Sequence, residues 1–475
     1  MKIHNIRMGH ATNSSSSHSI IVMERPPADE APESDEFGWE NFTLASRGSK
    51  VPYLARILYS ALNLPHRMAV AIVRDTLGYS PSEEGYIDHD SLWSLPKASD
   101  GHVHMGFAKE LFDHILREGV VILGGNDNGD CHPLTSAGCG FDGGRFRGGS
   151  FHSCITRKDE QGFWTLFNKS SGAKLRLSFG GETGRITASP THSTVPELVD
   201  LKITDYCAKG CRFCYQGSSR VGKHADKGTM ETILYELGFR LGVLEVAIGG
   251  GEPLEHPEFD SIIETAARDG ITPNVTTRRP LELAKRSRIV LDKIGAVGVS
   301  VGDDWLADIE SAVILRRAMG GGQDRLVLHA ILGVDPLDQI VKTATALHMP
   351  VLILGFKGVG RGASYGGCAA DTGKSLAAAI QSAWGVGCAR IGIDTCVAAK
   401  HKDVLDSLEI APTLYDTQEG RFSMYVDAVE MFAAPSSYCD PSQRVSISAG
   451  AVPGRSHNYK YDAIGAAFKS FSEAP

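Results

Sequence analysis

Short apolar segments alternate with helical segments from about Leu198 to Trp384, and this alternation limits the folds open to the chain. The apolar and helical members of the six pairs are 199–203 and 230–241, 244–248 and 259–268, 272–276 and 281–288, 296–301 and 308–319, 326–332 and 337–347, and 350–354 and 376–384. The strands are too uniformly apolar for a sheet with one face in water, so a parallel sheet with right-handed crossovers is expected. We therefore predict an α/β fold, open or curved into a partial barrel, with its chemistry at the carboxyl ends of the strands.

The segments on either side of this core lack its regular strand–helix alternation. The chain has 475 residues, which is enough for two or three domains. We expect an α+β N-terminal accessory or substrate domain at residues 1–196, the βα core at 197–386 and a small C-terminal extension at 387–475. Helical spacing over 53–77 and 108–116, and two strands at 163–167 and 174–179 around a turn, support the first assignment. The N-terminal domain is expected to cover the core or to recognise the substrate.

Charge and hydropathy exclude some classes of protein. Lys and Arg number 48 against 56 Asp and Glu, a formal charge of −8, which argues against a protein held by nucleic-acid phosphates. No apolar run approaches the ~20 residues that span a bilayer, and Ile20–Met23 is too short for a secretory signal. We expect a cytoplasmic protein that binds neither nucleic acid nor membrane. In that compartment the ten cysteines are better interpreted as metal ligands than as disulfides.

Three cysteines follow the first strand of the core with the spacing Cys-x3-Cys-x2-Cys: Cys207, Cys211 and Cys214. Three thiolates on one loop can hold iron or zinc, because both metals favour sulfur ligands. A [4Fe–4S] cluster usually takes four cysteines, so three would leave one iron open to a non-protein ligand. The alternative is a structural zinc site with His224 as the fourth ligand.

A glycine-rich segment, Gly249 to Pro253, follows the second strand. Glycines there let the backbone approach a ligand closely, and peptide edges with one carboxylate can bind an ammonium group. Because neighbouring parallel strands end at the same edge, we expect this segment to lie beside the three cysteines.

Together these motifs resemble the radical S-adenosylmethionine (radical SAM) superfamily, over about Leu198 to Trp384. The resemblance rests on the cysteine triplet, on Phe213 before the third cysteine and on the run Gly250-Gly251-Glu252-Pro253. It implies a partial (βα)6 parallel barrel and a [4Fe–4S] cluster on the three cysteines, with the fourth iron held by S-adenosylmethionine. It also implies that reduction cleaves S-adenosylmethionine to a 5′-deoxyadenosyl radical that abstracts hydrogen from a substrate. A ferredoxin- or flavodoxin-like protein would supply the electron.

The resemblance assigns further roles near the cofactor. Glu252 and the Gly250–Gly251 edge, closed by Pro253, would bind the methionyl ammonium group, and Phe213 would lie against the adenine. Ser300, at the end of the fourth strand, occupies a position that often contacts the ribose or carboxylate. Thr277 ends the third strand in Thr276-Thr277-Arg278, where relatives often have Thr-Asn-Gly, and is a further candidate.

Other polar residues leave alternatives open. Lys357 and Arg361 follow the sixth strand and either bind a substrate carboxylate or phosphate or belong to a solvated turn. The late cysteines hold an auxiliary iron–sulfur cluster, supply one functional thiol or are buried thiols; they are Cys368, Cys388, Cys396 and Cys439. A glycine-rich loop carries a possible zinc set, for which ordinary loop residues are the alternative: Cys131, His132, Cys139, His152 and Cys154.

We therefore expect a radical SAM enzyme. The cysteine-bearing C-terminal extension favours a peptide or protein side chain as the substrate, with a small metabolite as the alternative. A non-enzymatic zinc-binding α/β protein is the competing hypothesis from a different class.

Overall fold

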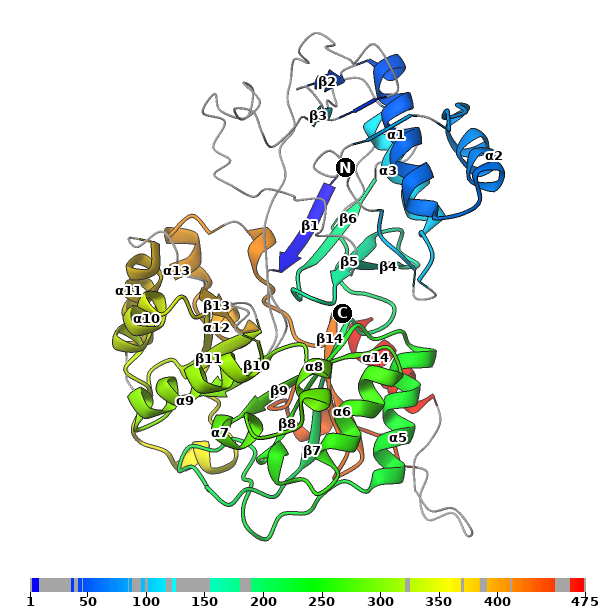
Figure 1. Cartoon of the computed structure of the whole chain (residues 1–475). Helices are drawn as coiled ribbons and strands as arrows, with labels where there is room; N and C mark the ends of the chain where they lie inside the picture. The colour runs from blue at the N-terminus through cyan, green and yellow to red at the C-terminus, as the bar shows by residue number, and fades with distance from the viewer. Residues whose placement is uncertain are drawn as a thin grey trace. The chain divides into compact units, whose positions relative to one another are not determined.

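The computed structural model of the chain describes residues 2–7, 36–37, 42–44, 46–83, 85–87, 95–98, 101–116, 122–124, 154–179, 189–320, 325–368, 371–384, 391–410, 412–448 and 462–473. The chain divides into two compact units (Figure 1). The first comprises residues 1–4, 19–170 and 174–189, and the second comprises residues 5–18, 171–173 and 190–475. The expected boundaries at 196 and 386 remain a prediction. No helix among the described residues has the length and hydropathy needed to cross a bilayer.

The first unit combines three helices with antiparallel strands. The helices are α1 (Arg47–Leu62), α2 (His66–Leu77) and α3 (Met105–Ile115). The strands are β1 (Lys2–Arg7), β4 (Cys154–Lys158), β5 (Trp164–Asn168) and β6 (Lys174–Ser178) in the order β1-β6-β5-β4, and a separate pair, β2 (Phe42–Leu44) and β3 (Ile122–Gly124). Helical spacing over 53–77 does not produce one helix, because Asn63 adopts a left-handed conformation that ends α1, and Pro65 precedes α2.

The second unit contains a ten-stranded sheet that is mixed and open. Its strands, in spatial order, are β13 (Ile391–Ile393), β12 (Val351–Leu354), β11 (Leu326–Ile331), β10 (Val297–Ser300), β9 (Thr272–Thr277), β8 (Glu245–Gly250), β7 (Leu198–Thr204), β14 (Ser423–Asp427), β15 (Phe432–Ala434) and β16 (Val445–Ser446). The strands from β13 to β14 pair in parallel, and β15 and β16 are antiparallel. The predicted α/β fold with a parallel sheet is confirmed.

Helices connect successive strands of this sheet, as the alternating strand–helix pattern predicts (Figure 1). They are α5 (Lys227–Tyr235), continued by a π-helical turn (Glu236–Arg240), α6 (Phe259–Arg268), α7 (Pro280–Leu283), α8 (Arg288–Lys293), α9 (Trp305–Ala318), α10 (Leu337–Ala346), α11 (Thr372–Trp384), α12 (Thr395–Lys400), α13 (Lys402–Ser407) and α14 (Ala463–Ser472). The sequence does not predict that the C-terminal segment extends the core sheet at both ends, with β13 beside β12 and β14 beside β7.

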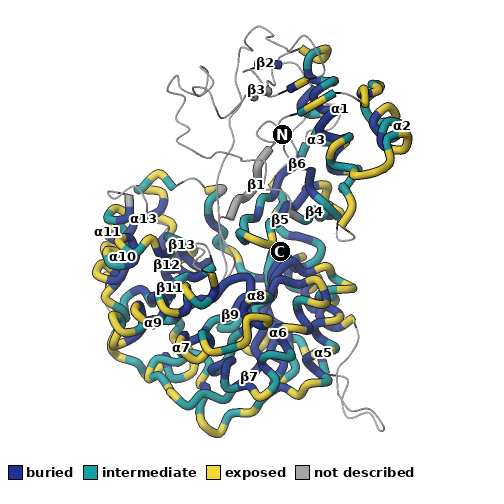
Figure 2. Tube along the Cα trace, in the orientation of Figure 1, coloured by how far each residue is buried: buried dark blue, intermediate teal, exposed yellow. Residues whose placement is uncertain are grey.

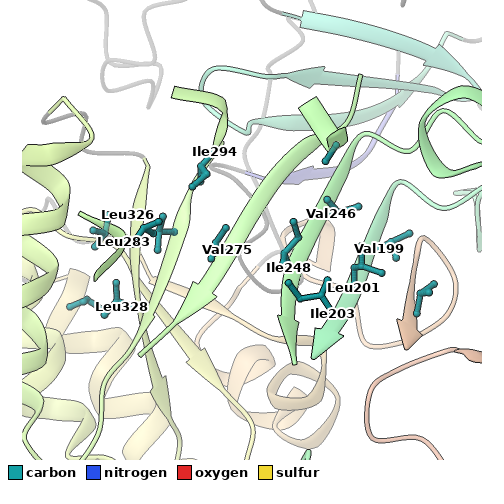
Figure 3. Close-up of a cluster of buried hydrophobic side chains, with 14 of the residues drawn as sticks. Val199, Leu201, Ile203, Val246, Ile248, Val275, Leu283, Ile294, Leu326 and Leu328 are labelled. Carbon is teal, nitrogen blue, oxygen red and sulfur yellow. The ribbon is translucent and has the colours of Figure 1, made fainter. Parts of the chain in front are cut away.

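Successive residues of β7 alternate between the apolar core and a face of the strand that carries polar side chains. Val199, Leu201 and Ile203 are fully buried in the main apolar cluster, where they lie near Val246 and Ile248 of β8 (Figures 2 and 3). Because successive strand residues point to opposite faces, Asp200, Lys202 and Thr204 are on the other face of β7. This face of β7 carries polar side chains that bind other segments of the unit.

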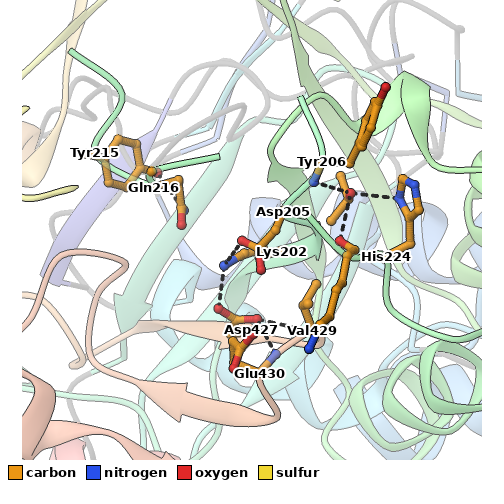
Figure 4. Close-up of polar contacts among 12 residues, drawn as sticks. Lys202, Asp205, Tyr206, Tyr215, Gln216, His224, Asp427, Val429 and Glu430 are labelled. Carbon is orange, nitrogen blue, oxygen red and sulfur yellow. Dashed lines mark hydrogen bonds and ion pairs between the residues drawn. The ribbon is translucent and has the colours of Figure 1, made fainter. Parts of the chain in front are cut away.

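A buried ion pair joins β7 to the C-terminal strand β14 (Figure 4). The Lys202 ammonium lies 2.8 Å from Asp427 and 2.5 Å from Asp205, the residue that follows β7. Asp427 also accepts hydrogen bonds from the backbone amides of Val429 and Glu430. Burial alone would lower the pKa of Lys202, but the two carboxylates outweigh burial and raise it. The ion pair therefore fixes the C-terminal strand to the start of the cysteine loop.

The Lys202→Met variant is expected to lower the free energy of unfolding by about 3–5 kcal/mol, because it leaves two carboxylates without their cation in the interior. Lys342→Met is the control, since the pair that Lys342 makes with Asp338 at 2.7 Å is exposed on α10, and such pairs contribute about 0.3–0.5 kcal/mol. Urea denaturation followed by circular dichroism measures both. Equal losses in the two variants would show that the buried pair does not anchor β14.

Candidate functional site

One cavity of about 500 Å³ lies at the carboxyl ends of the parallel strands. It collects nearly all the residues to which the family resemblance assigns a role: Cys207, Cys211, Phe213, Cys214, Gly250, Gly251, Glu252, Thr277 and Ser300. Pro253 is the exception, because it is buried behind the cavity, where it begins a short 3₁₀ turn (Pro253–Glu255). The cysteine triplet and the glycine-rich segment therefore face the same space.

The cysteine loop leaves β7 and folds back on itself. The Cys207 amide donates to the Ser219 carbonyl at 3.0 Å, and the Asp205 amide donates to the Lys223 carbonyl at 2.8 Å. All three sulfurs are free thiols and partly accessible. A thiol that faces a cavity and is not in a disulfide can serve as a metal ligand once it is deprotonated.

Arg361 holds this loop from the far end of the sheet. Its guanidinium donates to the carbonyls of Cys211, Gly217 and Ser218 at 2.9, 2.9 and 2.8 Å, and its backbone amide donates to the Cys214 carbonyl at 3.0 Å. The sequence left Arg361 as a substrate ligand or a solvated turn residue, and the structure gives it neither role. Arg361 positions the cysteine loop. Its contact with the Cys211 carbonyl spans 150 residues of sequence, so no local pattern predicts it.

The Arg361→Ala variant is expected to lose at least half of its bound iron after anaerobic reconstitution, because three carbonyls of the loop would lose their guanidinium donor. Arg220→Ala is the matched control: Arg220 is exposed and donates to a single carbonyl of the same loop, that of Ala208, at 3.1 Å. Iron and sulfide are counted per chain in both variants. Equal retention of iron would mean that the loop keeps its shape without Arg361.

The glycine-rich segment lies directly on the backbone of the cysteine loop. The Gly251 amide donates to the Thr204 carbonyl at 2.6 Å, and the Glu252 amide donates to the Tyr206 carbonyl at 2.9 Å. Gly250 has a φ of +117°, which side chains rarely adopt. A Cβ atom on Gly251 would lie 2.0 Å from the Tyr206 carbonyl oxygen. Glycine is therefore required for the two motifs to meet.

Glu252 is almost fully buried at the wall of the cavity, with 4% of its surface exposed. Its carboxylate accepts hydrogen bonds from the Thr277 hydroxyl at 2.6 Å and from the backbone amides of Arg278 and Leu254. Burial raises the pKa of Glu252, and these hydrogen bonds oppose that rise. Thr277 thus acts on the carboxylate that the family resemblance assigns to an ammonium group.

Arg278 is a cavity residue that the sequence analysis did not single out. Its guanidinium nitrogen Nη1 lies 3.2 Å from the Cys211 sulfur, and Nη2 lies 3.8 Å from Asp308. The Arg278 guanidinium therefore lies against one member of the cysteine triplet. The departure of this strand end from Thr-Asn-Gly was the only local signal for such a residue.

The structure gives His224 a role outside the cavity. Its Nδ1 lies 2.8 Å from the Thr204 hydroxyl, and its ring packs against Tyr206 and His256 (Figure 4). His224 is not among the residues that line the cavity with the cysteines. It therefore supports the base of the loop and does not complete the ligand set of the zinc alternative. Among the described residues, no group of three or more Cys, His, Asp or Glu side chains, the cysteine triplet included, already converges on one metal position.

The remaining cysteines do not gather at the cavity wall. Cys396 packs against Gly355 and interacts with Tyr438, whereas Cys439 interacts with Arg444. Burial raises the pKa of both thiols. Cys388 lies outside the described residues, and so does the glycine-rich loop with Cys131, His132, Cys139 and His152; the side chain of Cys154 is also outside them. An auxiliary cluster remains a prediction.

Comparisons with known proteins agree with this geometry. The family model of the radical SAM superfamily matches residues 201–348, which include the triplet and the glycine-rich segment. No curated protein matches the chain. The solved structure of Streptococcus suis SuiB bound to S-adenosylmethionine is 14% identical, with a TM-score of 0.43 over 67% of this chain and 89% of that chain.

Two further solved structures are similar to the chain. The structure of anSMEcpe with bound AdoMet is 14% identical, with a TM-score of 0.40 over 53% of this chain and 74% of that chain. BtrN in complex with AdoMet and 2-DOIA is 12% identical, with a TM-score of 0.25 over 58% and 86%. These likenesses are too distant to transfer a substrate. With the family-model match over residues 201–348 and its two motifs lining one cavity, the chain contains a radical SAM superfamily domain.

Proposed function

We propose that this enzyme reductively cleaves S-adenosylmethionine at a [4Fe–4S] cluster held by Cys207, Cys211 and Cys214, and that it modifies a peptide or protein side chain. The observation that carries the proposal is the shared cavity, in which three free thiols face a glycine-lined segment and a buried carboxylate. When bound, the cluster and its nucleotide supply a 5′-deoxyadenosyl radical that can abstract hydrogen from a substrate.

The residues present suit these two groups by their chemistry. Three thiols on one loop, with the Arg278 guanidinium beside Cys211, match the sulfur donors that iron prefers. The glycine segment presents a peptide edge without side chains, next to the Glu252 carboxylate, for an ammonium group. Phe213, whose ring lies 5.6 Å from that of Tyr365, offers an aromatic face for the adenine. Ser300 and Thr277 supply hydroxyl groups on the same wall.

The choice of substrate rests on the C-terminal segment. Glu419, Tyr425 and Tyr438 come from this segment and lie behind the cavity wall formed by Asp200 and Lys357. A segment that adds polar groups beside the reaction space suits a substrate larger than the cavity itself, such as a peptide. A small metabolite held entirely within the cavity is the second candidate. A low-potential ferredoxin or flavodoxin would supply the electron.

Anaerobic reconstitution tests the proposal. The protein should be brown, with about four irons per chain, and dithionite with S-adenosylmethionine should yield 5′-deoxyadenosine. Colourless protein with stoichiometric zinc would overturn the assignment. Incubation with peptides encoded by neighbouring genes, followed by mass spectrometry, separates the two substrate classes, since a mass change confined to small molecules would favour the metabolite.

A further inference from the structure

A second, much smaller cavity of about 30 Å³ adjoins the large one. Asp200, Ala247 and Lys357 line both cavities, so the two share a wall. The small cavity lies between β7 and the C-terminal strand β14, and Glu419 and Tyr438 close its other side. A space of this volume holds one group of about the size of a water molecule.

Acidic groups outnumber basic groups around the small cavity. Asp200, Asp394 and Glu419 line it together with one cation, Lys357. The Lys357 ammonium lies between two aromatic rings, 4.5 Å from the centre of Tyr215 and 4.6 Å from that of Tyr438. Burial works against the charge on Lys357, but Tyr215 and the three carboxyl groups outweigh burial and raise its pKa. Lys357 therefore stays charged, and it is the only cationic side chain among the residues that line the small cavity.

The three carboxyl groups differ in what they bind. Asp394 accepts from the backbone amides of Gly355 and Val397 and so caps α12. Glu419 accepts from the Tyr438 hydroxyl at 3.0 Å. In the part of the chain that the structure describes, no hydrogen bond or close ion pair is made by the side chain of Asp200.

Asp200 is half-buried and lines both cavities. Burial raises the pKa of Asp200 to about 6 and that of Glu419 to about 7, although Lys357 opposes both shifts. Both acids are thus still able to ionise near neutral pH, and each would be stabilised by an added cation. A carboxylate without a hydrogen-bond partner beside an unfilled space can accept from a ligand with the opposite charge.

We propose that the small cavity binds a primary ammonium group of the substrate, with Asp200 and Glu419 as its acceptors. The volume fits an ammonium group. Leu198 and Ala247 give the cavity an apolar wall suited to an alkyl stem that leads from the ammonium group into the large cavity. This inference rests on the proposed function, because it names a chemical group of the substrate that the same site would modify.

The test uses n-butylammonium chloride as the probe and n-butanol as its neutral counterpart. Each is titrated into the reconstituted full-length protein, with and without S-adenosylmethionine, and binding is followed by saturation-transfer NMR. The ammonium probe should bind at least tenfold more tightly than the alcohol, in both conditions. The Asp200→Asn variant should lose at least tenfold in affinity for the ammonium probe and keep its affinity for the alcohol. Asp338→Asn, an exposed acid on α10, is the control and should change neither.

Three results would overturn the inference. Displacement of the probe by S-adenosylmethionine would place the ammonium group at the nucleotide subsite. Complete displacement by an equal concentration of potassium chloride would identify a site for inorganic cations. Unchanged affinity in a folded Asp200→Asn variant would remove the proposed acceptor. Formation of 5′-deoxyadenosine is measured on the same samples, so a failure of amine binding is distinguishable from a failure of the proposed radical chemistry.

Discussion

The Cys211→Ala variant should retain less than a tenth of the iron of the parent protein and form at least a hundredfold less 5′-deoxyadenosine. Removing one of three thiolates leaves two protein ligands on a loop that faces a solvent-accessible cavity, and two are too few to hold a cluster that usually takes four. The Cys211 side chain is only partly buried, so the fold itself should survive the change. Iron, acid-labile sulfide and 5′-deoxyadenosine are measured together after anaerobic reconstitution.

Cys439→Ala is the matched control for this prediction, because Cys439 is also a partly buried free thiol but lies in the C-terminal segment. It should keep about four irons per chain. If Cys211→Ala kept its iron and its activity, the triplet would not be the cluster site. If the parent held about eight irons and Cys439→Ala lost part of them, the auxiliary cluster expected as one alternative from the sequence would be established.

The Gly251→Ala variant should lower the free energy of unfolding of the second unit by about 3 kcal/mol and prevent stable cluster loading. The added Cβ atom would lie 2.0 Å from the Tyr206 carbonyl oxygen and 2.7 Å from its carbon. Both contacts are with backbone, which cannot move without breaking the bond from the Gly251 amide to the Thr204 carbonyl. Overpacking of this kind costs roughly 1–3 kcal/mol, and more where nothing can yield.

Gly249→Ala provides the comparison within the same glycine-rich segment. A Cβ atom at Gly249 would meet nothing within 4 Å, and its φ is not in the left-handed region. This variant should change the free energy of unfolding by less than about 1 kcal/mol. Urea denaturation gives the free energy of unfolding of both variants, and their iron content is measured after reconstitution. Similar losses in the two would mean that the close approach of the glycine segment to the cysteine loop is not what requires glycine.

Local pattern was enough to predict the strands and the two motifs. A parallel strand is buried on both faces, so its apolar run is visible without knowledge of its neighbours, and β7 to β12 lie where these runs predict. The placement of Cys211 and Gly251 on one cavity also follows from chain order, because successive parallel strands end at the same edge. Helical spacing was less informative in the first unit, where one left-handed residue, Asn63, divides the expected helix.

Long-range contacts could not be predicted in this way. Arg361 reaches the Cys211 carbonyl across 150 residues of chain, and Lys202 reaches Asp427 across 225. A single arginine or lysine in a sequence has no pattern that identifies its partner, since charged residues are usually solvated. Lys357 illustrates the same limit: the two alternatives for it were a substrate carboxylate or phosphate site and a solvated turn, and no local pattern predicts that it lies between two aromatic rings.

The amino-acid sequence by itself determined the strand–helix order, the family and the three thiols with their glycine-rich neighbour, because each of these is encoded within a few consecutive residues. Only the tertiary structure decided that β14 lies beside β7, that Arg361 fixes the cysteine loop and that Asp200 faces Lys357 and Glu419 across a small cavity. The reason is physical: burial and charge balance depend on which distant segments meet, and that is settled when the whole sheet assembles.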